Sequence, residues 1–169
     1  MEGWIHPEKN TPKIRLDLGA GDPTTNEVQA TGYVLQDVAP LEGIDLVCNI
    51  LDLHKYIRPG QLSEVRMSHV LEHFTIEEAK RILKMLYKLL SDDGKLIIIV
   101  PNFKWHAQLL LQGHEKEAVY YCFGGQLDEY DLHKTGYTPE ILKERLLEAK
   151  FALYTLTDET SISCVAVKV

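Results

Sequence analysis

Two glycines and an acidic residue stand where the first two apolar segments of the chain end. Gly19 and Gly21 lie at the end of the segment 13–19, and Asp37 lies at the end of the segment 33–38. A glycine has no Cβ, so the backbone at these positions can approach a bound molecule closely. A carboxylate sixteen residues after Gly21 can accept hydrogen bonds from both hydroxyls of a ribose. This spacing is typical of a site for an adenosine-containing cofactor.

The stretch between these residues distinguishes among such cofactors. Thr24 replaces the third glycine of the dinucleotide pattern G-x-G-x-x-G, and only about a dozen residues separate the two apolar segments. That length allows one or two helical turns, whereas a pyrophosphate is normally held at the N-terminus of a full helix. S-adenosylmethionine carries no phosphate, so these residues favour it over NAD. The alternative is a plain tight turn at the glycines, with Asp37 as a solvated strand end.

A second constellation, "HVLEH", contains His69, Glu72 and His73 and matches the H-x-x-E-H pattern of one class of zinc proteases. That chemistry requires both imidazoles on one face of a single helix. Thr75 and Glu78 form a capping-box pattern that starts the next helix only after this segment. We therefore expect His69 at a strand end, with the imidazoles diverging, and we predict no metal site. Glu72 is expected to accept backbone amides, and His73 is expected to pack nearby.

Candidates for a general base lie in the polar segment "EYDLHKTGY", and its members that carry titratable groups are Tyr130, Asp131, His133 and Lys134. His133 is the preferred base, because the ordinary pKa of an imidazole lies near operating pH. Asp131 is close enough in sequence to orient it, and His69 is the second choice. The alternative is that His133 caps or packs against the helix that follows.

Apolar runs of strand length alternate with helical patterns along the chain. Strands are expected at 13–19, 33–38, 44–50, 64–70 and 94–102, helices at 75–90 and 138–151, and a closing hairpin at 152–169. This alternation predicts an α/β fold, a Rossmann-like and mostly parallel seven-stranded sheet with helices on both faces and a C-terminal antiparallel hairpin. In such sheets ligands bind beyond the carboxyl ends of the strands, where Gly19, Gly21 and Asp37 would meet.

The segment 104–137 interrupts this alternation. It is helical in places, breaks at Gly113 and becomes polar and glycine-rich after residue 123. We expect it to cover the substrate, with Trp105, His106 and Tyr121 as candidate pocket residues. Tyr120, Tyr121 and Phe123 are otherwise expected to lie in the core.

Composition narrows the class of protein. The 169 residues are expected to form one domain, 1–169, and their net charge of −7 opposes an extended contact with nucleic acid. The longest apolar runs are too short to cross a bilayer, and the N-terminus has no signal-peptide pattern, so a cytoplasmic location is expected. The three cysteines are widely spaced and indicate free thiols. Nothing in the sequence indicates an oligomeric state.

Several segments carry a resemblance when taken in order: "LDLGAGD", "QDVAP", "NILDL", "SHVLEHF", "DDGKLIIIVPN" and "HKTGYTPEILKERLLEAKF". The chain resembles class I S-adenosylmethionine-dependent methyltransferases, and among them the small single-domain predicted methyltransferases with an HVLEH segment. The resemblance covers almost the whole chain from Lys13. It implies residues around the cofactor: Asp17, Gly19, Ala20 and Gly21 at the methionine portion, Asp37 at the ribose, Asn49, Ile50 and Leu51 at the adenine, and Ser68 and His69 at the reactive end. Many relatives have Asp at the position of Asn49, whose side-chain carbonyl can also accept a hydrogen bond.

The resemblance implies transfer of a methyl group to an oxygen or nitrogen of a small-molecule or glycan-type acceptor. A DNA base methyltransferase would carry an Asn/Asp-Pro-Pro-aromatic stretch where this chain has "SHVLEHF". Two alternatives remain open. The chain could be a catalytically idle module that binds S-adenosylmethionine or a protein partner, or it could be an NAD-dependent oxidoreductase.

Overall fold

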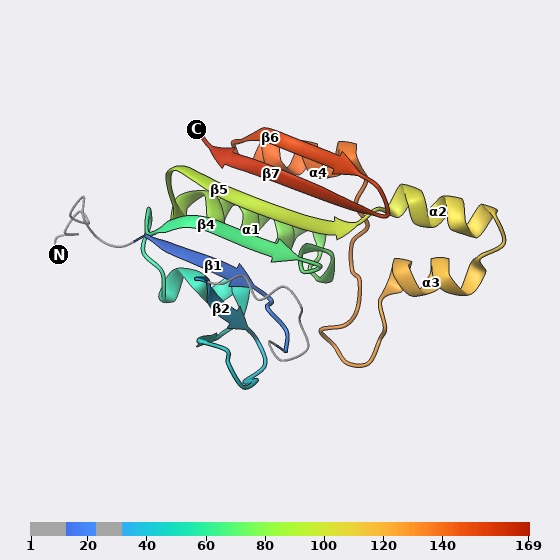
Figure 1. Ribbon diagram of the computed structural model, residues 1–169, viewed down its shortest axis with the longest axis horizontal. Coiled ribbons are helices and arrows are strands. Elements are labelled where there is room, and N and C mark those ends of the chain that lie inside the picture. The colour runs from blue at the N-terminus through green and yellow to red at the C-terminus, as the bar shows by residue number, and fades with distance from the viewer. Residues whose placement is uncertain (1–12, 23–31) are drawn as a thin grey trace.

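The chain folds around a seven-stranded sheet (Figure 1). The computed structural model describes residues 13–22 and 32–169. The strand order is β3-β2-β1-β4-β5-β7-β6, and the strands are β1 Ile14–Leu18, β2 Val34–Asp37, β3 Leu46–Val47, β4 Leu62–Ser68, β5 Leu90–Pro101, β6 Phe151–Asp158 and β7 Ser161–Lys168. β1 to β5 pair in parallel, whereas β7 pairs antiparallel to both β5 and β6. The predicted mostly parallel, seven-stranded Rossmann-like sheet with helices is confirmed, including the antiparallel pair at the C-terminal end.

Within residues 13–22 and 32–169, six helical segments accompany the sheet: η1 Ile50–Lys55, η2 Leu71–His73, α1 Ile76–Leu89, α2 Phe103–Leu111, α3 Glu115–Phe123 and α4 Pro139–Glu148. α1 contacts both η1 and α4, and Figure 1 shows α1 and α4 behind the strands, so these helices share one face of the sheet. None of the described helices has the length and apolar character needed to cross a bilayer. The helical turns expected in the first crossover fall on residues 23–31, outside the described residues.

α1 shows how local sequence sets an element. The Thr75 hydroxyl accepts the Glu78 N–H at 3.3 Å, and the Glu78 carboxylate accepts the Thr75 N–H at 2.9 Å, which is the predicted capping box. The buried face of the helix consists of Ala79, Ile82, Leu83, Leu86 and Leu89. Full burial of each large aliphatic side chain contributes about 1.5–3 kcal/mol.

The start of β5 differs from the expected one at residue 94. Pairing with β4 begins at Leu90, opposite Leu62, and then shifts so that Lys95 lies opposite Glu64. Four residues of β5 therefore face a single residue of β4, and Asp93 adopts a left-handed φ of 61° within this bulge. The polar "SDDG" stretch marks the bulge rather than a separate turn between helix and strand.

The late segment leaves the end of the sheet as a helical hairpin, α2 and α3, which projects to the right in Figure 1. Gly113, with a φ of 88°, separates the two helices as the sequence predicts. The expectation that Tyr120, Tyr121 and Phe123 lie in the core is wrong, because they are 59%, 42% and 55% exposed. α2 and α3 pack mainly against each other, which leaves their outer faces uncovered.

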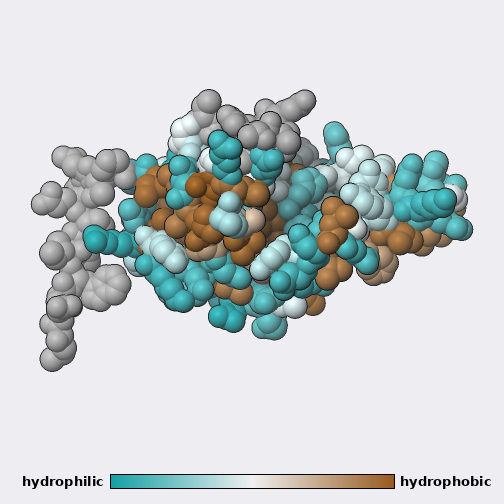
Figure 2. All heavy atoms as spheres, turned by 90° about the horizontal axis from the view of Figure 1, so that it is seen from below, coloured by the Kyte–Doolittle hydropathy of each residue, from teal (hydrophilic) through white to brown (hydrophobic). Residues whose placement is uncertain are grey.

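The edge of the sheet formed by β2 and β3 has an apolar surface. Seen from below, hydrophobic side chains gather over β2, β3 and the segment between them (Figure 2). Leu41 and Val47, which are 39% and 46% exposed, belong to this surface. Apolar atoms make up much of the surface of any folded protein, so this edge alone indicates no function.

Candidate functional site

A cavity of about 370 Å³ lies beyond the carboxyl ends of β1, β2 and β4, within the size range of small-molecule sites. Strand order reverses between β1 and β4, the position where open parallel sheets bind ligands. The residues that line the cavity come from five parts of the chain. They are Gly19 after β1, Gln36 to Val38 in and after β2, Asn49 to Leu51 at η1, His69, Val70, His73, Phe74 and Glu78 after β4, and Glu129, Tyr130 and Lys134 in the late segment.

The glycine turn and Asp37 are joined directly. The Gly21 N–H donates to Asp37 Oδ2 at 2.9 Å, and the Ala39 N–H donates to Asp37 Oδ1 at 2.9 Å. Gly19 and Gly21 have left-handed φ values of 62° and 65°, which favour glycine. The two amides orient the carboxylate at the cavity, and each of its oxygens keeps a second lone pair for a ligand hydroxyl.

Gln36 completes this support, and the sequence analysis missed it. Its side chain is buried, its Oε1 accepts the Gly19 N–H at 3.3 Å, and its Nε2 donates to the Cys48 carbonyl at 2.7 Å. The same residue's backbone carbonyl accepts the Ala20 N–H at 2.9 Å. Gln36 therefore connects the glycine turn to β2 and β3. An amide in an otherwise apolar strand, next to the candidate acid, is the signal that could have identified it.

Asn49, Ile50 and Leu51 line the cavity at the start of η1. Asn49 is the N-cap of this helix, and its Oδ1 accepts the Leu51 N–H at 2.9 Å. One lone pair of the Asn49 carbonyl is thus used to hold the local backbone. Ile50 is buried and supplies an apolar surface to the wall.

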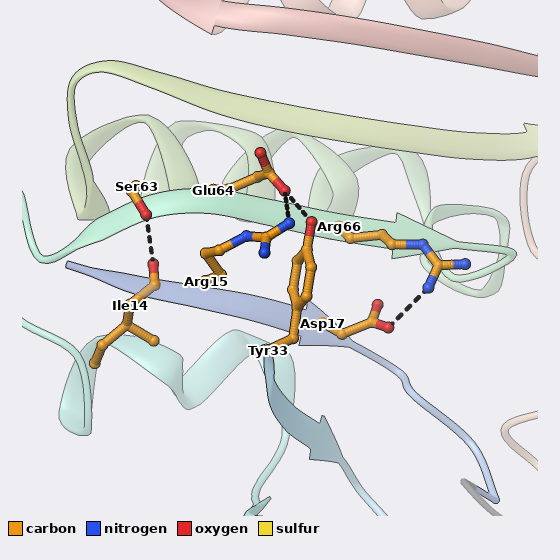
Figure 3. A network of polar contacts seen from close by, with 7 residues as sticks. All are labelled: Ile14, Arg15, Asp17, Tyr33, Ser63, Glu64 and Arg66. Carbon is orange, nitrogen blue, oxygen red and sulfur yellow. Dashed lines mark hydrogen bonds and ion pairs between the residues drawn. The ribbon is translucent and has the colours of Figure 1, made fainter. Parts of the chain in front are cut away.

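Asp17 lies away from the cavity lining. Its Oδ2 is 3.0 Å from Arg66 Nη1, and the two residues are register partners on β1 and β4. Figure 3 shows this pair beside a second cross-strand pair, Arg15 with Glu64, in front of the sheet. Burial raises the pKa of the Asp17 carboxyl, and the Arg66 guanidinium opposes that rise. Ala20, Gly21 and Ser68 are likewise outside the lining, although Gly21 contacts Asp37.

His69 follows the last residue of β4, as the sequence predicts, and lines the cavity. Its N–H donates to the Ile99 carbonyl at 2.8 Å, and its φ of 55° is left-handed. A non-glycine residue in this region carries about 1–3 kcal/mol of strain, and such strain clusters at functional sites. The side chain's Nδ1 lies 3.4 Å from Glu72 Oε1. Since Leu71–His73 forms a separate short helix, the H-x-x-E-H residues do not share one helix.

The environment of Glu72 contradicts the expectation that its carboxylate accepts backbone amides. Among the described residues, no donor makes a hydrogen bond to either of its buried carboxylate oxygens. It is the backbone carbonyl of Glu72 that accepts, from the N–H groups of Lys134 and Thr135 at 2.8 and 3.1 Å. This places the segment 133–135 against η2.

His133 lies behind the main cavity, in the lining of a second space of about 10 Å³. Its Nδ1 is 2.9 Å from the Tyr121 carbonyl oxygen, and its ring packs edge-on against His73 with centroids 4.9 Å apart. Asp131 Oδ2 instead accepts the Leu127 N–H at 3.3 Å. No ion pair joins Asp131 to His133 within the described part of the chain, so the structure does not bring the predicted base and its orienting acid together.

Trp105, His106 and Tyr121 form an aromatic group at the base of the helical hairpin. His106 stacks on Tyr121 with centroids 5.0 Å apart, and Trp105 meets His106 edge-on. Burial lowers the pKa of the His106 imidazole, and the nearby His133 lowers it further. His106 and Tyr121 line the small space, and none of the three lines the main cavity.

Comparison with solved structures places this fold among known ones. A SAM-dependent methyltransferase from Archaeoglobus fulgidus matches with a TM-score of 0.65 and 16% identity over 92% of this chain and 86% of its own. A SAM-dependent methyltransferase from Methanosarcina mazei matches with a TM-score of 0.65 and 16% identity over 92% of both chains. The 1,6-didemethyltoxoflavin-N1-methyltransferase of Burkholderia thailandensis, solved with S-adenosylhomocysteine, matches with a TM-score of 0.62 and 16% identity over 94% of this chain and 72% of its own.

No protein-family model matches the sequence, and no curated protein matches it. At these identities the structural likeness establishes the fold alone. The chain has the fold of these methyltransferases, and its cavity lies at the ligand-binding edge of that fold.

Proposed function

We propose that this protein is an S-adenosylmethionine-dependent methyltransferase that acts on an oxygen or nitrogen of a small-molecule or glycan-type acceptor. The observation that carries the proposal is the Gly21–Asp37 hydrogen bond at the rim of the 370 Å³ cavity. This hydrogen bond orients the Asp37 carboxylate, which would accept the ribose hydroxyls, beside a backbone that a ligand can approach. A Cβ added at Gly21 would meet no described atom within 4 Å, so there is open space on that side.

The charge of the cavity favours this ligand over a dinucleotide. Its lining holds three carboxylates, Asp37, Glu78 and Glu129, against one ammonium, Lys134. A pyrophosphate requires cations or a helix N-terminus, and an acidic wall repels it. A sulfonium and an α-ammonium are both positive, and an acidic wall attracts them. These charges support S-adenosylmethionine and oppose the NAD alternative.

S-adenosylmethionine, when bound, supplies a methyl group from its sulfonium. The sulfur is then left as a neutral thioether. The residues of this chain would then have to hold the acceptor in line with that methyl group. Orientation of this kind contributes up to roughly 7–11 kcal/mol. Glu129, Tyr130 and Lys134 line the cavity from the late segment and are proposed to form the acceptor's side of it.

A general base adds about 10²–10⁴-fold to the rate when the acceptor must lose a proton. Of the two imidazoles predicted as bases, His69 lines the cavity, whereas His133 lies behind it. We therefore assign the role of base to His69. Glu72, whose Oε1 lies 3.4 Å from His69 Nδ1, would stabilise the imidazolium that forms.

The class of acceptor rests on the sequence. The similar folds include an N1-methyltransferase and the CurJ carbon methyltransferase, the latter at 16% identity and a TM-score of 0.62 over 96% of this chain and 50% of its own. The fold thus serves different acceptor atoms. The net charge of −7 supports a small molecule or a glycan over nucleic acid.

Titration calorimetry with S-adenosylmethionine, S-adenosylhomocysteine and NAD tests the proposal. We expect S-adenosylmethionine and S-adenosylhomocysteine to bind and NAD not to bind. In thermal denaturation, a ligand at 100 times its Kd should raise the free energy of unfolding by about 2.7 kcal/mol. Stabilisation by NAD alone would overturn the proposal. Binding of S-adenosylmethionine without turnover on a panel of hydroxyl and amine acceptors would instead support an idle cofactor-binding module.

A further inference from the structure

Glu72 carries a buried carboxylate that makes no hydrogen bond to the described residues. The residue is 1% exposed, and among the residues that the structure describes neither of its carboxylate oxygens has a hydrogen-bond partner. His69 lies 3.4 Å away and can balance the charge only when it is protonated. A buried, unsatisfied carboxylate is strongly unfavourable unless a cation accompanies it. The position therefore points to a positively charged ligand.

Two imidazoles stand beside this carboxylate. One donor atom from each of Glu72, His73 and His133 lies within 4.8 Å of the others. A cation at about 2.0–2.2 Å from each donor needs the three donors within roughly 3.5 Å of one another, a contraction that small side-chain rotations can supply. The H-x-x-E-H pattern did not indicate this group, because His133 comes from a segment sixty residues after His73.

The imidazoles are already held as metal ligands usually are. His73 Nδ1 lies 3.2 Å from the Leu132 carbonyl oxygen, and His133 Nδ1 lies 2.9 Å from the Tyr121 carbonyl oxygen. A carbonyl only accepts, so in each neutral ring Nδ1 carries the hydrogen and Nε2 keeps its lone pair. Histidine ligands of metals almost always donate their other ring N–H to such a partner.

The backbone fixes the distance between the two chain segments. The N–H groups of Lys134 and Thr135 donate to the Glu72 carbonyl, and the Thr135 hydroxyl donates to the Phe74 carbonyl at 2.8 Å. His133 is therefore held beside Glu72 by contacts that do not involve its own side chain. A preformed cluster of this kind loses little entropy when it takes up an ion.

We propose that Glu72, His73 and His133 form a site for a transition-metal dication of the zinc class. Two imidazole nitrogens and one carboxylate oxygen suit such ions, whereas Mg²⁺ and Ca²⁺ prefer oxygen ligands throughout. His73 lines the main cavity, and Glu72 and His133 line the small space behind it, so the ion would lie in the wall between them. Three protein ligands leave a coordination position open. The site goes beyond the proposed methyl transfer. The two share Glu72, whose Oε1 lies 3.4 Å from His69 Nδ1, so metal binding and cofactor binding are measured separately.

The test uses untagged full-length protein, cleared of metal with a chelator and with no cofactor added. Titration calorimetry with ZnCl₂ is expected to show one site with micromolar or tighter affinity, and MgCl₂ is expected not to bind in this range. CoCl₂ is expected to give the visible absorption of tetrahedral or five-coordinate Co²⁺. Glu72→Gln and His133→Ala should each weaken Zn²⁺ binding by at least about tenfold, since second-shell changes alone cost about 10–100-fold.

His114→Ala is the matched control, because His114 is a histidine beside a carboxylate, Glu117, but belongs to no group of three potential metal ligands among the described residues. It should bind Zn²⁺ as tightly as the wild-type protein. Glu72→Gln removes an uncompensated charge, so this variant should remain folded without metal, and circular dichroism checks that it does. If the Glu72→Gln variant unfolds, His73→Ala is tested in its place. The proposal is overturned if the wild-type protein does not bind Zn²⁺, or if the Glu72 and His133 variants bind it as tightly as the control. Neither result bears on the binding of S-adenosylmethionine, which is measured separately.

Discussion

Asp17 and Arg66 form a largely buried ion pair across β1 and β4, with the carboxylate Oδ2 3.0 Å from the guanidinium Nη1. Removing one partner of such a pair leaves an uncompensated charge, which typically costs about 3–5 kcal/mol. We expect Arg66→Met to lower the free energy of unfolding by that amount in urea denaturation. The double variant Asp17→Leu/Arg66→Met should recover most of the loss, because apolar pairs of similar volume replace buried ion pairs well. Equal instability of the double variant would show that the pair is not the cause.

The loss of stability in Arg66→Met should also depend on pH. Burial raises the pKa of Asp17, while Arg66 lowers it, so Arg66→Met should raise the folded-state pKa further. A carboxyl with a raised folded-state pKa contributes stability below its unfolded pKa, near 3.8, and loses it as pH rises through the folded value. The stability difference between wild-type protein and Arg66→Met should therefore widen as pH rises from 4 toward neutrality. A difference that stays constant over this range would contradict the assignment.

Replacing Asp37 should change the affinity for the ligand without changing the fold. Asp37→Ala removes the acceptor proposed for the ribose hydroxyls, and hydrogen bonds to charged groups are worth about 1.5–3 kcal/mol. We expect the Kd for S-adenosylmethionine to rise by about 10–100-fold in calorimetry. Asp45→Ala is the control, since Asp45 also accepts a backbone amide, that of Leu35 at 2.8 Å, but does not line the cavity. Unchanged affinity in Asp37→Ala would remove this residue from the site.

The two glycines of the turn should respond differently to alanine. Both have a left-handed φ, but a Cβ at Gly19 would lie 2.6 Å from Val70 Cγ2, whereas one at Gly21 would meet no described atom within 4 Å. The backbone strain costs roughly 1–2 kcal/mol at either position, and overpacking adds about 1–3 kcal/mol at Gly19 alone. Gly19→Ala should thus be the less stable variant in thermal denaturation. Adding Val70→Ala should restore more stability to the Gly19→Ala variant than to the Gly21→Ala variant. Equal gains in the two variants would contradict the contact between a Cβ at position 19 and Val70.

The helix cap and the residues at the carboxyl edge of the sheet were predictable from the sequence. Side-chain contacts between segments that are far apart in the sequence were not. Thr75 and Glu78 lie three residues apart, so their capping box could be recognised directly. Gly21 and Asp37 could be placed together because parallel strands end at one edge. The Asp17–Arg66 pair depends on strand register, which apolar patterns alone did not determine. The position of His133 depends on how the segment 124–137 returns to η2, where periodicity carries no information.

His106 provides a test of the buried aromatic group. Burial lowers the pKa of its imidazole below the ordinary value of 6.5, and His133 adds to this effect. A base with a lowered folded-state pKa contributes stability above its unfolded pKa and loses it as pH falls through the folded value. The free energy of unfolding should therefore decline as pH falls below about 6.5, and His106→Phe, which keeps a ring against Tyr121, should decline less. Tyr121→Phe retains the imidazole and should keep the wild-type slope. If His106→Phe and the wild-type protein lose stability in parallel between pH 7 and pH 5, the acid sensitivity arises elsewhere.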